Sequence, residues 1–225
     1  MKNKYYLFKL NTNILNILSI AIMVILFLIT NIFVSDFMIK IFESKTCILV
    51  LALLVPYLCL HEILHSISYV IHGAKFKNIT YGANIEKGVL CCLCKQNINK
   101  KNILFSLMYP FTFIGVVTYI IGIIINSNVL IGLSIMNMAG CSGDLIMFFN
   151  LIKLKDFEYS EYDDPISFGL YTKNDWTNKK MFGLQYVETL DKLKREDYKK
   201  IRISKTSIIT FILLFLMIII YLLIL

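Results

Sequence analysis

The chain has 225 residues, of which 57% are hydrophobic and 17% charged, and its mean hydropathy is +0.69. This composition excludes a disordered chain, which needs low hydrophobicity, and argues against a soluble cytosolic enzyme. The net charge of +8 would suggest nucleic-acid binding in a soluble protein, but in a membrane protein it more often records topology. We therefore expect the lipid bilayer, and not nucleic acid, to be a partner of this chain.

Five apolar stretches are long enough to cross a hydrocarbon core, for which a helix needs about 20 residues. They cover residues 14–34, 46–73, 103–125, 128–152 and 206–225. The first is too long for the core of a signal peptide, and no small-residue cleavage site follows it, so we expect it to remain as an anchor. The pattern predicts an all-α integral membrane protein with about five transmembrane helices.

The basic residues predict the orientation of these helices. With the N-terminus inside, the inner segments 1–13, 74–102 and 153–205 carry 3, 6 and 12 Lys+Arg, whereas the outer loops carry only Lys40 and Lys45. Because cytoplasmic loops are enriched in Lys and Arg, this asymmetry places the N-terminus and residues 153–205 in the cytoplasm. The expected location is the cell membrane, with the C-terminal end outside.

Two segments between the apolar stretches have patterns of their own. Residues 74–102 show partial alternation of apolar residues around a turn signal at Glu86-Lys87-Gly88, which predicts a short β-hairpin at the inner face. Residues 153–205 form a small cytosolic appendage, in which Met181, Leu184, Val187, Leu190 and Leu193 recur at spacings that predict a helix. The domains expected are a four-span core over 1–152, the appendage over 153–205 and a last helix over 206–225.

The second apolar stretch contains all three histidines of the chain, in the order His61-Glu62-Ile63-Leu64-His65 and then His72. Two histidines four residues apart lie on one face of a helix, about 6 Å apart along its axis, so both imidazoles can bind one Zn²⁺. The adjacent Glu62 is the general base that takes a proton from the attacking water. The alternative is a set of polar side chains packed between helices without a metal, although charged groups inside a span usually mark a function.

A third ligand is needed, because catalytic zinc sites have three protein ligands and one open position. Asp144 is the only other acidic side chain within the predicted spans, and small residues around it allow its helix to approach the second span or to loosen locally. The alternative is a small-residue packing contact. Asn137 shares the face of Asp144 and could bind substrate, or could hydrogen-bond between helices. His72 is expected at the membrane interface, outside the ligand set.

These residues resemble the putative zincin peptidases, a family of small bacterial membrane proteins, and more distantly the site-2 proteases. The resemblance covers roughly residues 46–170 and is carried by His61-Glu62-x-x-His65, the hairpin glycines Gly82 and Gly88, Pro110 and Gly143-Asp144. It implies that His61, His65 and Asp144 bind zinc and that Glu62 is the catalytic base. The site-2 proteases carry Asn-Pro-x-x-Asp before their aspartate, whereas this chain has Ala-Gly-Cys-Ser-Gly-Asp.

The sequence thus predicts a membrane-embedded zinc metalloendopeptidase whose substrate is a membrane protein or a peptide. The hairpin edge could hold an extended substrate by β-addition. A non-catalytic membrane protein that retains a metal site, such as a pseudoprotease, an immunity factor or a scaffold, is the alternative, although a structural site has no need of Glu62. Transport is a third possibility, which the lack of repeats disfavours.

Overall fold

The computed structural model describes residues 4–84, 89–161, 166–177 and 180–191. The helices are α1 (Thr12–Phe33), α2 (Phe37–Ile41), α3 (Ser44–Ile71), α4 (Lys100–Pro110), α5 (Thr118–Ile124), α6 (Asn128–Gly140) and α7 (Ser142–Leu151), with a 3₁₀ turn at Phe76–Asn78 and a π-helix at Phe111–Val117. The strands are β1 (Lys4–Leu10), β2 (Ile79–Asn84), β3 (Val89–Cys94), β4 (Ile98–Asn99), β5 (Glu158–Glu161), β6 (Ser167–Thr172) and β7 (Leu184–Leu190).

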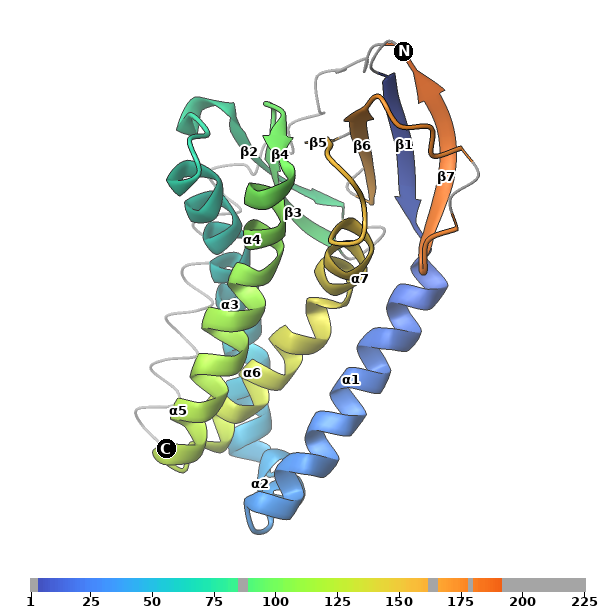
Figure 1. The fold of residues 1–225 in the computed structure, drawn as a ribbon. Helices are drawn as coiled ribbons and strands as arrows, with labels where there is room; N and C mark the ends of the chain where they lie inside the picture. The colour runs from blue at the N-terminus through green and yellow to red at the C-terminus, as the bar shows by residue number, and fades with distance from the viewer. Residues whose placement is uncertain (1–3, 85–88, 162–165, 178–179, 192–225) are drawn as a thin grey trace.

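The helices run alternately up and down, and the strands gather at one end of them (Figure 1). The helix α1 leads away from the strands to the short helix α2, and α3 returns. The π-helix joins α4 and α5 into one rod that leads away again, and α6 and α7 return together. As a result, α3 and the α6–α7 pair run in the same direction, which is the arrangement expected for the helices that carry the two histidines and Asp144.

Within the described residues, three helical segments are long and apolar enough to cross a membrane: Thr12–Phe33, Ser44–Ile71 and Lys100–Ile124. A fourth span exists if the bent pair α6 and α7 counts as one, and the stretch 206–225 lies outside the described residues. The prediction of five transmembrane helices is therefore wrong for the structure as described. One of the two missing spans is the fourth stretch, which bends by 47° instead of continuing as a single straight helix, and the other is the stretch outside the described residues.

The prediction of an all-α fold is also wrong, because the strands form a five-stranded antiparallel sheet with the order β4-β5-β6-β1-β7. The strand β1 lies inside this sheet between β6 and β7, where the sequence predicted only a basic segment before the first span. The strand β1 pairs with β6 on one side and β7 on the other, with Tyr5 opposite Tyr171 and Leu190. Phe8, Phe168 and Leu170 bury their side chains in the core beneath this sheet.

The helix predicted from the spacing of Met181 to Leu193 is wrong over the described residues, where Leu184–Leu190 form the strand β7. Leu184 is buried, but Tyr186 and Val187 are exposed, so the three-residue spacing of the apolar side chains does not mark one buried face. The tyrosine, valine and threonine in this segment favour a strand, and the edge of β1 supplies the partner that decides between the two structures.

The predicted hairpin is present, since β2 and β3 pair as a separate two-stranded antiparallel sheet, with Tyr81 opposite Cys92. Its turn signal at 86–88 lies outside the described residues. Tyr81 ties the hairpin to the second span because its hydroxyl lies 2.6 Å from the Ser66 hydroxyl on α3. This contact fixes the hairpin one turn from the histidines.

Candidate metal centre

The helix α3 positions the two histidines of the HExxH sequence. His61 and His65 lie one turn apart on the side of α3 that faces α4 and α6, and both side chains are buried, with 9% and 7% of their surface exposed. The opposite face of α3 carries exposed apolar residues, among them Ile63, Ile67 and Val70. The helix therefore turns its polar side chains toward its neighbours and its apolar side chains outward, as a lipid-facing helix does.

A break in the fourth apolar stretch positions Asp144. The helix α6 ends at Gly140 and α7 begins at Ser142, with Cys141 between them and an angle of 47° across the break. Asp144 lies in the first turn of α7, where the positive end of the helix dipole favours a carboxylate. An added Cβ at Gly140 would meet nothing within 4 Å, so the break is open at this residue.

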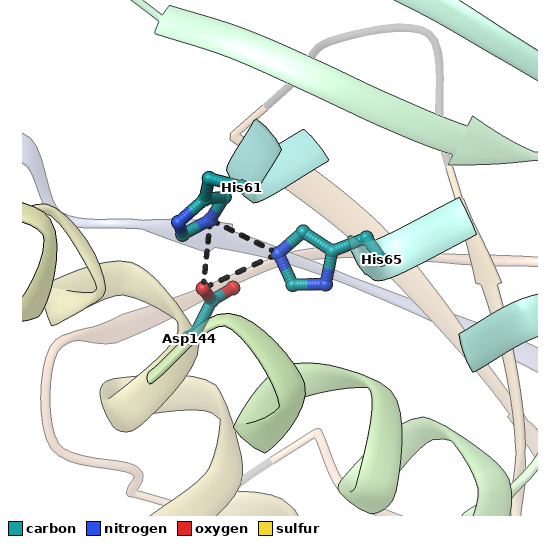
Figure 2. A group of neighbouring side chains, drawn as sticks. All are labelled: His61, His65 and Asp144. Carbon is teal, nitrogen blue, oxygen red and sulfur yellow. Dashed lines mark hydrogen bonds and ion pairs between the residues drawn. The ribbon is translucent and has the colours of Figure 1, made fainter. Parts of the chain in front are cut away.

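Three side-chain atoms from these two elements meet at one point (Figure 2). The Nε2 atoms of His61 and His65 lie 3.1 Å apart, and they lie 3.5 and 3.4 Å, respectively, from Oδ2 of Asp144. Ligand atoms about 2.0–2.1 Å from a tetrahedral zinc ion are separated by about 3.3 Å. The spacing of the three atoms, and their chemistry, thus fit a zinc site with three protein ligands.

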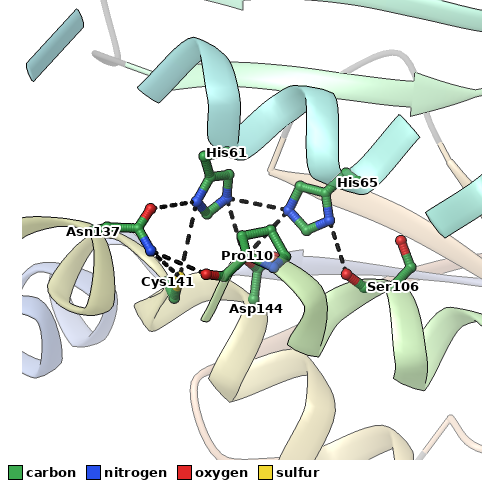
Figure 3. Close-up of polar contacts among 7 residues, drawn as sticks. All are labelled: His61, His65, Ser106, Pro110, Asn137, Cys141 and Asp144. Carbon is green, nitrogen blue, oxygen red and sulfur yellow. Dashed lines mark hydrogen bonds and ion pairs between the residues drawn. The ribbon is translucent and has the colours of Figure 1, made fainter. Parts of the chain in front are cut away.

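The other ring nitrogen of each histidine identifies the tautomer (Figure 3). Nδ1 of His65 lies 3.0 Å from the carbonyl oxygen of Ser106, and Nδ1 of His61 lies 3.0 Å from Oδ1 of Asn137. Carbonyl oxygens only accept, so each Nδ1 must carry the hydrogen and donate it. When the rings are neutral, as metal ligands must be, each directs the lone pair of Nε2 toward the carboxylate of Asp144, and the three acceptors converge on a point that suits a cation.

Asn137 has a role that the sequence left open between substrate binding and helix packing. Its Nδ2 group donates to the carbonyl oxygen of Pro110 at 3.2 Å, which turns Oδ1 toward His61. The side chain is 1% exposed, so it is enclosed behind the histidine. The structure therefore places Asn137 as a group that orients the ring of His61.

Sequence reasoning missed two further neighbours of the histidines. One is the main-chain carbonyl of Ser106, which no side-chain pattern reveals. The other is Cys141, whose sulfur lies 3.9 Å from Nδ1 of His61 and 3.8 Å from Nδ2 of Asn137. Because Cys141 contacts the Nδ1 side of His61, it is not one of the three converging atoms. Its position three residues before Asp144, on the same helical face, is the feature of the sequence that could have indicated this contact.

Glu62 lies next to this cluster and beside the hairpin. Its half-buried carboxylate accepts a hydrogen bond from the main-chain N–H of Cys92 on β3, and it interacts electrostatically with both histidines. The strand β3 thus runs past the one acidic side chain in the HExxH sequence. The third histidine is separate from the cluster: Nδ1 of His72 donates to the Ser68 carbonyl oxygen at 2.7 Å, and its ring stacks on Phe105.

With this geometry established, a comparison with protein families identifies the region that carries it. Residues 54–157 match a family described as "Putative zincin peptidase". The expected resemblance to the putative zincin peptidases is confirmed, and the more distant one to the site-2 proteases stays a prediction. The matched zincin region, residues 54–157, contains the histidines, Glu62 and Asp144. A zincin is a zinc-dependent peptidase, so the match indicates the metallopeptidase class and zinc as the ion. No curated protein and no solved structure matches the chain at the significance required.

Proposed function

We propose that this protein is an integral membrane zinc endopeptidase that cleaves a peptide bond of a membrane protein or peptide within or near the bilayer. The observation that carries the proposal is the convergence of the His61, His65 and Asp144 acceptor atoms beside Glu62. The match of residues 54–157 to the zincin peptidases supports the same reaction class.

Each side chain has a distinct part in this reaction. His61, His65 and Asp144 would hold the zinc ion and leave one position open. A bound zinc ion supplies Lewis-acid chemistry, lowering the pKa of a water and polarising the scissile carbonyl. Glu62 accepts the proton of the attacking water and returns it to the leaving nitrogen, because its carboxylate adjoins the cluster without being one of the three converging groups.

The depth of the site indicates where cleavage takes place. Counted from the inner end of the second span at 1.5 Å per residue, His65 lies about 12 Å and His61 about 18 Å along the helix. A substrate helix must unwind before a carbonyl can reach such a site. We place the unwound substrate along the hairpin, since β3 passes directly beside Glu62 and a sheet edge can pair with an extended peptide.

Metal analysis of the purified protein tests the ligand set. The wild type should contain one zinc ion per chain, and His61→Ala or Asp144→Ala should lose it, because a zinc ion with two protein ligands is held far more weakly. His72→Ala is the matched control, since its ring lies outside the cluster and should leave the zinc content unchanged. A folded Asp144→Ala protein with full zinc content would remove Asp144 from the ligand set.

Replacement of Glu62 by Gln tests the chemistry separately from the metal. Glu62→Gln should retain zinc and lose cleavage by about 100-fold or more, which is the usual loss on removal of a general base. Cleavage of any membrane protein creates a new N-terminus, so the assay needs no defined substrate. It compares the protein N-termini in membranes of cells that express the wild type with those in cells that express Glu62→Gln. If both proteins retain zinc and neither creates new N-termini, the non-catalytic alternative is favoured.

A further inference from the structure

Pro110 lies where the third span passes the histidines, and its ring changes the hydrogen bonding of the helix there. In an α-helix the carbonyl of Ser106 would accept a hydrogen bond from the N–H of residue 110. Proline has no N–H, and its ring pushes against the carbonyl four residues earlier. The next N–H along the chain, that of Phe111, bonds to Met108 instead. The helix therefore leaves the Ser106 carbonyl available to a side chain.

His65 uses this carbonyl. Its Nδ1–H donates to the Ser106 oxygen at 3.0 Å, in a region where both residues are buried (Figure 3). Prolines are tolerated in transmembrane helices when a neighbouring group satisfies the carbonyl that they release. Here the neighbouring group is a histidine whose opposite nitrogen is one of the three converging atoms.

The carbonyl of Pro110 itself reaches the other histidine. It accepts a hydrogen bond from Nδ2 of Asn137 at 3.2 Å, and the Oδ1 atom of that amide accepts from Nδ1 of His61 at 3.0 Å. Because the nitrogen of the Asn137 amide must face the Pro110 carbonyl, its oxygen is the atom that faces His61. Residue 110 is thus linked to both histidines: its missing N–H leaves the Ser106 carbonyl to His65, and its own carbonyl holds the Asn137 amide that accepts from His61.

We propose that Pro110 is a positioning residue of the metal centre: by withholding its N–H, it releases the Ser106 carbonyl that holds His65 in the tautomer with a bare Nε2. The proposal rests on the proposed function of His61, His65 and Asp144 as zinc ligands. Groups behind metal-bound histidines fix the ring and the tautomer, and their loss costs about 10- to 100-fold in metal affinity. Pro110 is fully buried and carries out this role through its backbone alone.

A pair of variants that share a side chain and differ in the backbone bond between Tyr109 and residue 110, an amide in one and an ester in the other, tests this role. Pro110→Ala restores the N–H, so the Ser106 carbonyl can return to the helix ladder and compete with His65. Pro110→lactic acid has the same side chain as alanine but an ester oxygen in place of the N–H. Zinc affinity, measured by chelator competition on the full chain in detergent, should fall about 10- to 100-fold in Pro110→Ala and stay close to the wild type in Pro110→lactic acid.

A second variant and a second measurement keep the result decisive. Replacing Leu107 by its α-hydroxy acid turns the Ser106 carbonyl into an ester carbonyl, a weaker acceptor, and should also weaken zinc binding. In metal-free protein labelled with ¹⁵N-histidine, the wild type should show His65 protonated at Nδ1, and Pro110→Ala should show a mixture of tautomers. This readout does not require zinc, so it separates a failure of the Pro110 role from a failure of the proposed zinc site. Equal zinc affinity and equal His65 spectra in Pro110→Ala and Pro110→lactic acid would overturn the proposal.

Discussion

At the scale of single residues, the two histidines of the site each have a defined partner at Nδ1 in an apolar interior. The rings of His61 and His65 are held at Nδ1, which leaves Nε2 of both for the point shared with Asp144. An unpaired polar group in such surroundings is costly, so the arrangement of donors and acceptors is as restrictive as the packing. When both rings are neutral, the atoms at the shared point are all acceptors, which is the arrangement that a bound cation needs.

The role of Asn137 leads to a prediction about metal affinity. Asn137→Ala should lower zinc affinity by about 10- to 100-fold, because His61 loses the acceptor that orients it and the Pro110 carbonyl loses its donor. The matched control is Asn150→Ala, which removes another buried asparagine on the same apolar stretch, whose Nδ2 donates to the Ile146 and Phe182 carbonyls. Chelator competition measures both. A substrate-binding Asn137 would instead impair cleavage and leave the zinc affinity at the wild-type value.

The residues of the site differ in how visible they are in the sequence. His61, Glu62 and His65 were predicted because a helix brings residues four apart together, and this is a local rule. Asp144 was predicted because few acidic residues lie within apolar stretches. The orientation of Asn137 depends on an amide between two other helices, and the Ser106 carbonyl belongs to the main chain. Neither leaves a pattern in the order of side chains.

At the scale of elements, the close approach of α6 to the π-helix holds Asn137 against Pro110. Gly115 makes this contact possible, since an added Cβ would lie 2.7 Å from Cγ of Met138 and 3.5 Å from Nδ2 of Asn137. The carbonyls of the π-helix are satisfied in part by side chains: the Ile114 oxygen accepts from Tyr57 and Thr118, each at 2.7 Å. Side chains on α3 and α5 thus stabilise the irregular hydrogen bonding of the π-helix.

Gly115→Ala should therefore destabilise the protein by about 1–3 kcal/mol, which is the usual cost of overpacking a core. Thermal unfolding in detergent measures the change, and zinc affinity should fall with it because Asn137 is displaced. Adding Met138→Ala should recover part of the loss, since the two side chains compete for one space. Gly140→Ala is the control, because its Cβ would meet nothing within 4 Å. Equal unfolding temperatures for Gly115→Ala and Gly140→Ala would contradict the assigned contact.

Elements with local signals were predicted and those with distant partners were not. The apolar stretches and the β2–β3 hairpin are formed by neighbouring residues, so their patterns are readable in the sequence. The strand β1 has seven residues and pairs with β6, more than 150 residues away, and no periodicity reveals such a partner. For β7, three-residue spacing suggested a helix, and only the edge of β1 shows why a strand forms.

At the scale of the whole molecule, the sheet unites the start of the chain with the segment that follows the spans. Lys4 pairs with Thr172 and Lys9 with Ser167, so the N-terminal strand and the segment around Trp176 must lie on the same side of a membrane. The turn between α2 and α3 lies at the opposite end of the helices (Figure 1). The structure thus supplies an argument about sidedness that is independent of the distribution of charge.

The last prediction joins this geometry to the positive-inside asymmetry, which assigns the sheet end to the cytoplasm. Alkaline phosphatase is active only outside the cytoplasm, and a fluorescent protein of the ordinary kind folds only within it. Inserted into the full chain after Phe42, in the turn between α2 and α3, phosphatase should be active and the fluorescent protein dark. Inserted after Asn174, close to β6, the two reporters should show the reverse. The opposite pattern at both positions would agree with the arrangement of the helices but would show that the predicted membrane orientation is inverted. Equal activity at the two positions would contradict the arrangement itself, because at least one span must separate the sheet from the distal turn.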